Sequence, residues 1–352
     1  MEVNELLNIT KEKNASDLHL NIGIPPIIRI NGKLTKLNFP ELTQEITHGM
    51  IYSILNEKQK RDFEKNGELD LSYELANIAR FRINAFKHRR GEGAAFRLIP
   101  EKIKTLSELG LPSILADFSE KEKGLVLVTG PTGSGKSTTI AALIDIINKN
   151  KYINIITIED PIEFIHAHKN CIVSQREIGS HTPSFSSALR NALREDPDVI
   201  LVGEMRDLET ISMALTAAET GHLVFSTLHT ISAAETVERI IDVFPPHQQN
   251  QVRMQLAGSL QGIIAQTLLP TLDGAGRAAA LEIMIANPAI RNLIREGKTH
   301  QIPSTIQISK KDGMQSLDQS LKDLVMEDKI SREDAMKKAI DKKAFMERQY
   351  SY

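Results

Sequence analysis

Short apolar runs separated by amphipathic stretches mark the part of the chain that follows residue 122. The runs lie at 125–129, 153–158, 199–202 and 223–227. Runs of this length suit parallel strands that are covered on both faces. Amphipathic stretches of helical period separate them, at 137–149, 184–194 and 207–220. This alternation predicts an α/β sheet.

The first hundred residues have a different pattern. Polar and apolar residues alternate at 16–22, and Asn31-Gly32 separates two short runs, which is typical of a hairpin. Spacing over 43–65 predicts helical structure, and strands are expected at 69–75, 80–86 and 94–99. We therefore expect a small α+β domain over residues 1–100, a linker over 101–122, and an α/β core with C-terminal helices over 123–352.

The last hundred residues are expected to be mostly helical. Pro245-Pro246 opens one predicted helix, residues 289–296 form another that Gly297 closes, and Ser331 with Asp334 has the spacing of a helix cap. The final residues, 345–352, match no pattern.

Composition narrows the class of protein. The 352 residues are 41% hydrophobic and 25% charged, as in soluble globular proteins, and no apolar run approaches the roughly 20 residues of a membrane span. One cysteine excludes an internal disulfide and a multi-cysteine zinc site, and the N-terminus has no export signal, so we expect a cytoplasmic protein. The net charge of −2 gives no reason to expect direct contact with nucleic acid.

A phosphate-binding loop follows the first apolar run of the core. The motif G-x-x-x-x-G-K-[ST] is complete, and with the next residue it comprises Gly130, Pro131, Thr132, Gly133, Ser134, Gly135, Lys136, Ser137 and Thr138. Glycines let backbone N–H groups surround phosphates, and the start of the following helix adds partial positive charge. We therefore predict ATP or ADP binding, with Lys136 reaching the β- and γ-phosphates and Ser137 binding Mg²⁺.

Acidic and histidine side chains follow three of the other apolar runs. Ligands of open α/β sheets bind at the carboxyl ends of the strands. The third run is followed by Gly203 and then by Glu204, and Glu204 is the predicted water-activating residue. Glu159, Asp160 and Glu163 are expected to hold the metal, partly through water.

His229, at the end of the fourth run, is expected to contact the γ-phosphate. The alternative is that these residues are only the polar ends that strands usually have.

Arginines of the small domain are candidates for stabilising the charge that develops on the γ-phosphoryl group. Alternation places Arg80 and Arg82 on one face of their strand, and Arg97 lies on the next strand, so Arg82 and Arg97 are expected to be close together. The alternative is a solvated basic face. Arg194, Arg206 and Arg239 are weaker candidates.

The motifs together resemble the secretion-type hexameric ATPases, and among them the type IV pilus retraction (twitching-motility) ATPases. The resemblance covers residues 1–345 and is carried by segments 15–20, 80–86, 130–138, 158–164, 194–207, 220–230 and 289–297. It implies a PAS-like N-terminal domain and a RecA-like core. It matches Glu204 to the catalytic glutamate, His222 and His229 to a histidine box, and Arg82 and Arg97 to phosphate contacts.

The same resemblance implies partners and a location. It implies a homo-hexamer that acts on a pilus platform protein at the inner face of the inner membrane and works with an accessory retraction ATPase. Three alternatives stay open. The chain itself could be the accessory ATPase, although the segment 289–297 favours the main enzyme. It could also be a nucleotide-binding ring adaptor that does not hydrolyse ATP, or a motor for DNA transfer.

Overall fold

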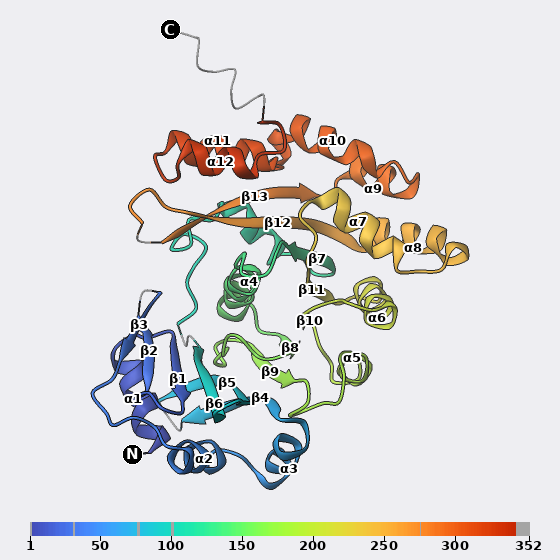
Figure 1. The fold of residues 1–352 in the computed structure, drawn as a ribbon. Helices are drawn as coiled ribbons and strands as arrows, with labels where there is room; N and C mark the ends of the chain where they lie inside the picture. Colours follow the sequence, from blue (N-terminus) through green and yellow to red (C-terminus); the bar gives the residue numbers. More distant parts are fainter. Residues whose placement is uncertain (1, 31, 76–77, 100–101, 275, 343–352) are drawn as a thin grey trace. The chain divides into compact units, whose positions relative to one another are not determined.

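The computed structural model describes residues 2–30, 32–75, 78–99, 102–274 and 276–342 (Figure 1). It divides the chain into two compact units, of which the first ends at Lys102 and the second begins at Ile103. The expected linker over 101–122 therefore belongs almost wholly to the second unit. Leu106, Leu111, Leu115 and Phe118 of this segment are buried in that unit's core, the last two in the 3-10 helix η1 (Ser113–Phe118).

The first unit is a six-stranded antiparallel sheet with strand order β3-β2-β1-β6-β5-β4. The predicted hairpin and later strands are confirmed. The strands are β1 (Asp17–Asn21), β2 (Ile27–Ile30), β3 (Lys33–Lys36), β4 (Glu68–Leu75), β5 (Ala79–His88) and β6 (Gly91–Ile99).

The helical structure predicted over 43–65 is confirmed. It is divided into two helices, α2 (Gln44–Ser53) and α3 (Glu57–Asn66). Asn56 breaks the run: its side chain accepts a hydrogen bond from the backbone N–H of Gln59, which starts a new helix. The unpredicted helix α1 (Val3–Glu12) buries Leu6 and Leu7, each contributing about 1.5–3 kcal/mol.

The second unit contains a seven-stranded sheet with strand order β13-β12-β7-β11-β10-β8-β9. Six strands are parallel, and β13 runs antiparallel to β12. The predicted strands and helices of this core are confirmed. They are β7 (Gly124–Thr129), α4 (Lys136–Asn150), β8 (Asn154–Glu159), α5 (Phe185–Ala192), β10 (Val199–Val202), α6 (Leu208–Glu219) and β11 (Leu223–Leu228). The edge strand β9 (Ile172–Glu177) was not predicted.

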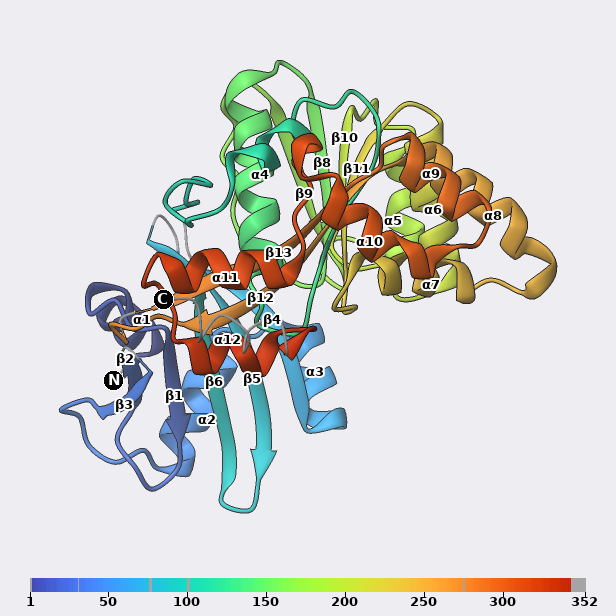
Figure 2. The same ribbon diagram turned by 90° about the horizontal axis from the view of Figure 1, so that it is seen from above.

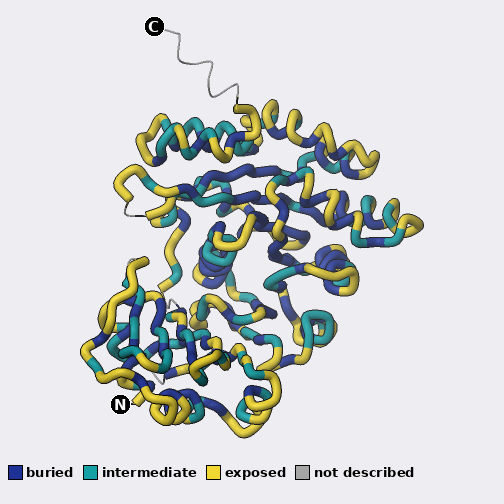
Figure 3. Tube along the Cα trace, in the orientation of Figure 1, coloured by how far each residue is buried: buried dark blue, intermediate teal, exposed yellow. Residues whose placement is uncertain are grey.

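Helices cover both faces of this sheet (Figures 1 and 2). Leu125 and Leu127 of β7 face a core shared with α5 and α6, whereas Val126 and Val128 face α4 and η1. Figure 3 shows the resulting buried strands beneath more exposed helices. The strands are continuous apolar runs because neither face meets water.

The expectation that the chain is mostly helical after residue 245 is wrong for residues 260–285. There β12 (Leu260–Pro270) and β13 (Arg277–Ile285) form a long antiparallel pair. β12 also pairs with β7, so it lies inside the sheet. The remaining segments are helical: α7 (Ala233–Asp242), α8 (Pro246–Ser259), α9 (Pro288–Arg295), η2 (Thr299–Gln301), α10 (Ile302–Ile308), η3 (Lys310–Asp312), α11 (Leu317–Met326) and α12 (Arg332–Lys338).

The predicted helix signals near this end of the chain are confirmed. Gly297 follows α9 with a φ of +68°, and Ser331 accepts a hydrogen bond from the backbone N–H of Asp334 at the start of α12. The segment 345–352 lies outside the described residues. No helix in the described ranges has the length and apolar character that a bilayer crossing requires.

Candidate nucleotide site

The strand register brings the predicted catalytic residues to one edge of the sheet. Leu228 of β11 pairs with Thr129 of β7, directly before the phosphate loop, and Val202 of β10 pairs with Ser226 of β11 and Ile158 of β8. The carboxyl ends of β7, β11, β10 and β8 therefore lie side by side. Residues that follow these ends are neighbours of the phosphate loop.

The phosphate loop has the backbone that its glycines predict. Gly130, Gly133 and Gly135 have φ angles of +141°, +77° and +88°, which L side chains rarely adopt. Gly135 caps α4, so the helix begins at Lys136. Lys136 Nζ donates hydrogen bonds to the carbonyl oxygens of Gly130 (2.8 Å) and Pro131 (3.2 Å), so the ammonium group lies inside the loop.

Glu204 lies between the side chains of Arg206 and His229. Its Oε2 accepts a hydrogen bond from Arg206 Nη2 at 2.8 Å, and its Oε1 lies 3.2 Å from His229 Nε2. Burial raises the pKa of Glu204, but hydrogen bonds and charge from Arg206 and His229 outweigh it and hold that pKa below its usual value. The carboxylate is therefore ionised at neutral pH, as a water-activating residue must be.

Backbone contacts fix the turn that carries Glu204. Thr227 Oγ1 donates to the carbonyl of Gly203 at 2.6 Å, and the N–H of Met205 donates to the carbonyl of Thr227. A Cβ on Gly203 would lie 3.2 Å from the carbonyl oxygen of Ile158 on the neighbouring strand. Gly203 therefore lets this turn pass close to β8, and the prediction that it leaves room beside Glu204 stays a prediction.

The acidic segment after β8 lies at the same edge. Ser137, Glu159 and His166 line one small cavity with Gly203 and Thr227. Burial raises the pKa of Glu159, against hydrogen bonds from Thr157 Oγ1 (2.7 Å) and Gln175 Nε2 (3.2 Å).

Two further acids have electrostatic neighbours at this edge. Glu163 and Glu204 raise the pKa of Lys136, which burial lowers more strongly, and Asp160 raises the pKa of Arg206. No group of three or more His, Cys, Asp or Glu side chains in the described ranges has the geometry of a preformed metal site.

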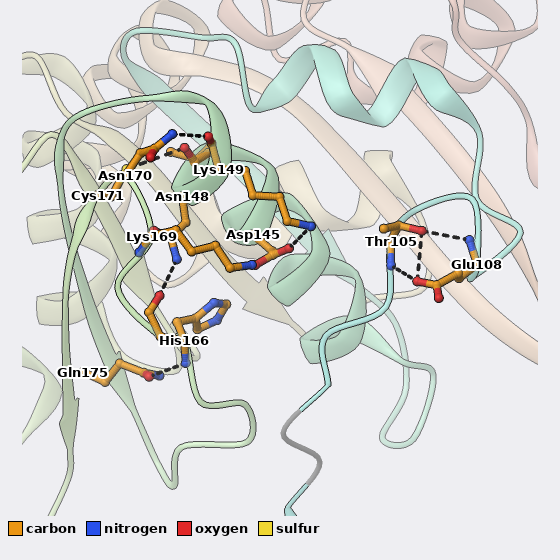
Figure 4. A network of polar contacts seen from close by, with 12 residues as sticks. Thr105, Glu108, Asp145, Asn148, Lys149, His166, Lys169, Asn170, Cys171 and Gln175 are labelled. Atoms are coloured by element: carbon orange, nitrogen blue, oxygen red, sulfur yellow. Dashed lines mark hydrogen bonds and ion pairs between the residues drawn. The ribbon is translucent and has the colours of Figure 1, made fainter.

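Polar contacts attach the continuation of this acidic segment to the phosphate-loop helix (Figure 4). Asn148, fully buried on α4, donates to the carbonyl of Ala167 and accepts from the N–H of Lys169. Lys169 forms an ion pair with Asp145, one helical turn before Asn148. Residues 167–169 are therefore held against the last two turns of α4.

His222 does not lie with the other predicted residues. Its carbonyl accepts a hydrogen bond from the N–H of Gly124, at the amino end of β7. Seven residues separate it from His229 along β11, a span of roughly 20 Å at the rise of a strand. The two histidines that the resemblance matches to one histidine box therefore lie at opposite edges of the sheet within this chain, and a contact of His222 with nucleotide stays a prediction.

The two arginines of the first unit are neighbours, as predicted. Arg82 pairs directly with Arg97 in the register of β5 and β6. Arg97 Nε donates to Asp17 Oδ1 at 3.1 Å, and the side chain of Arg97 is 71% exposed. The pair therefore presents positive charge to solvent within this unit.

Sequence reasoning missed two residues of the β12–β13 pair. The side chain of Gln266 contacts Ser134, and Arg277 Nη1 lies 3.3 Å from the carbonyl oxygen of Gly133. It also treated Arg206 only as a possible arginine for a neighbouring site, whereas the structure places it beside Glu204.

Comparison with known proteins agrees with this geometry. Residues 3–288 match the family described as type II/IV secretion system protein. The chain belongs to this family. Its α/β fold, with a P-loop core and a smaller unit, also matches the crystal structure of the pilus retraction motor PilT with bound ADP. The TM-score is 0.92 at 50% identity, and the match covers 98% of both chains.

Two curated relatives show the range of this secretion-system family. The type IV pilus retraction ATPase PilT of Pseudomonas aeruginosa is 56% identical over 96% of this chain and 98% of its own. The type IV pilus ATPase PilU of the same organism is 44% identical over 96% of this chain and 88% of its own. This chain, with an intact phosphate loop beside Glu204, is an ATPase of the same family.

Proposed function

We propose that this ATPase powers the retraction of type IV pili, working as a homo-hexameric ring. The observation that carries the proposal is the meeting of Glu204 and His229 at the edge of the sheet that holds the phosphate loop. The relatives named for pilus retraction align over nearly their whole length, which supports the same task here.

In the proposed mechanism the loop binds the triphosphate through backbone N–H groups and Lys136. The ammonium group of Lys136 then gives up its hydrogen bonds to the carbonyl oxygens of Gly130 and Pro131 and binds phosphate oxygens in their place. Glu204 then orients a water molecule and accepts its proton as the water attacks the γ-phosphorus. His229, in contact with Glu204, transmits the presence of the γ-phosphate to this carboxylate.

The donor set fits Mg²⁺, which prefers oxygen ligands and keeps several of its waters. Ser137 would supply a hydroxyl, and Glu159, Asp160 and Glu163 would hold the ion partly through water. When bound, Mg²⁺ neutralises charge on the β- and γ-phosphates. The absence of a preformed cluster in the described ranges suits this mode, because phosphate oxygens complete the coordination.

Arg82 and Arg97 are proposed to contact the phosphates in the assembled ring. Their cross-strand pairing and the exposure of Arg97 support this role. The ring is proposed to act from the cytoplasm on a platform protein at the inner membrane. Within the family, the higher identity to PilT than to PilU favours the main retraction enzyme over the accessory one.

Imaging of pili in a strain that lacks this gene tests the proposal. Excess surface pili without twitching motility is the expected result. Complementation with the wild-type gene should restore twitching, whereas complementation with Lys136→Ala should not. Cells without pili would contradict retraction and indicate extension. Full restoration of twitching by Lys136→Ala, together with negligible ATP turnover by the wild-type protein, would instead support a ring adaptor that does not hydrolyse ATP.

A further inference from the structure

The side-chain amide of Gln266 joins the phosphate loop to the helix that follows it. Gln266 lies on β12 and is 5% exposed. Its Nε2 donates a hydrogen bond to the carbonyl oxygen of Ser134 at 2.6 Å, and its Oε1 accepts one from Thr139 Oγ1 at 2.7 Å. Ser134 belongs to the loop and Thr139 to the first turn of α4, so one amide connects the loop to its helix.

The same residue explains why two loop positions must be glycine. A Cβ on Gly130 would lie 2.2 Å from the backbone oxygen of Gln266, and one on Gly135 would lie 2.8 Å from its Nε2. Real Cβ atoms do not approach other atoms so closely. The loop is therefore shaped around Gln266 as well as around a phosphate group.

The contact with Ser134 has a consequence for the opposite side of the peptide. A trans peptide is planar, and its C=O and N–H groups point in opposite directions. When Gln266 holds the carbonyl of Ser134 toward β12, the N–H of Gly135 points away from β12. Such N–H groups are those that bind phosphate in loops of this kind.

A second contact from the same strand pair acts on the preceding peptide. Arg277 on β13 donates to the carbonyl oxygen of Gly133 at 3.3 Å. The two strands therefore hold two consecutive carbonyls of the loop. Gln266 is the stronger support, because its hydrogen bond is shorter and buried.

We propose that Gln266 is a positioning residue for nucleotide binding, which orients the N–H of Gly135 toward the phosphates by holding the carbonyl of Ser134. This inference rests on nucleotide binding by the phosphate loop and is independent of the role in pilus retraction.

Gln266→Met and Gln266→Glu test the proposal in the full-length chain, with ADP affinity measured by calorimetry at pH 8 and pH 6. Methionine keeps the length of the side chain and loses both hydrogen bonds. We expect ADP to bind about tenfold more weakly, the effect of one lost hydrogen bond that leaves a buried acceptor unpaired.

Gln266→Glu adds a readout that a merely structural role would not change. At pH 8 an ionised carboxylate faces the carbonyl of Ser134 and has no hydrogen to donate, so ADP should bind weakly. Burial favours the protonated acid as the pH falls. The neutral acid repeats the hydrogen bonds of the amide, because it can donate to Ser134 and accept from Thr139. Each ADP affinity is compared with that of the wild type at the same pH, and the deficit of Gln266→Glu should be smaller at pH 6 than at pH 8.

Gln261→Glu is the matched control. Gln261 lies on the same strand, and its Nε2 donates to the backbone carbonyl of Lys123 at 2.9 Å, near the opposite end of β7 from the loop. Its ADP affinity should stay within twofold of wild type at both pH values. If Gln266→Met does not fold, Thr139→Val removes the other end of the connection and should weaken ADP binding several-fold.

Two results would overturn the proposal. One is wild-type ADP affinity in folded Gln266→Met or, failing that variant, in Thr139→Val. The other is a loss in Gln266→Glu that is the same at both pH values or is matched by Gln261→Glu.

Discussion

Oε1 of Glu204 lies 3.2 Å from Nε2 of His229, at the carboxyl ends of two adjacent parallel strands. The contact joins the residue proposed to activate water to the residue proposed to sense the γ-phosphate. A change in the position of His229 therefore changes the hydrogen bonding and charge at Glu204 directly. In the proposed mechanism this contact would couple recognition of the triphosphate to its hydrolysis.

The guanidinium of Arg206 should set the acid limb of the pH–rate profile. Burial raises the pKa of Glu204, and Arg206 is the first of the groups that lower it overall. In Arg206→Gln this pKa rises, so the carboxylate takes up a proton at higher pH and loses its function as a base. The acid limb of kcat/KM for ATP should therefore move to higher pH.

The control for this prediction is Arg190→Gln, which removes an exposed arginine paired with Glu209. Its profile should match that of the wild type. An unchanged acid limb in Arg206→Gln would show that ionisation of Glu204 does not govern the rate.

Asn148 should stabilise the second unit and the acidic segment together. Asn148→Ala removes two part-buried hydrogen bonds, to the carbonyl of Ala167 and from the N–H of Lys169, each worth about 0.5–1.5 kcal/mol. We expect a lower free energy of unfolding in urea and a higher Mg²⁺ concentration for half-maximal ATPase activity, because the segment that carries Glu163 loosens.

Asn191→Ala is the comparison for stability, since the Asn191 amide contacts only the exposed carbonyl of Ser187 one turn earlier on α5. Its free energy of unfolding should change by less than about 0.5 kcal/mol. Equal destabilisation by both variants would mean that the hydrogen bonds of Asn148 to the acidic segment contribute nothing to the free energy of unfolding.

Arg97 should matter for activity and little for folding. Its ion pair with Asp17 is solvent-exposed on the arginine side, and such pairs contribute about 0–1 kcal/mol. Arg97→Ala should therefore lower the ATPase rate of the assembled protein while its thermal midpoint stays close to that of the wild type. Lys36→Ala, on the exposed strand β3, should change neither. A wild-type ATPase rate in Arg97→Ala would show that Arg97 does not take part in hydrolysis.

Local sequence was sufficient for much of this site. The strand, loop and helix around Lys136 are contiguous, and parallel strands place Glu204 and His229 at one edge wherever they fall in the chain. The β12–β13 pair was missed because a run buried on both faces has no alternation that separates a strand from a buried helix.

Other features depend on contacts that no local pattern carries. Gln266 reaches Ser134 and Thr139 across more than a hundred residues of sequence. The resemblance matches His222 and His229 to one histidine box, but β11 lies between them, so the separation of the two side chains depends on the fold.

Steady-state ATPase activity of Glu204→Gln, measured beside its affinity for ATP, tests the central claim most directly. The amide keeps the size of the side chain and removes the base, so the account predicts a rate at least about a hundredfold lower with ATP binding retained. A Glu204→Gln protein that hydrolyses ATP at the wild-type rate would contradict it.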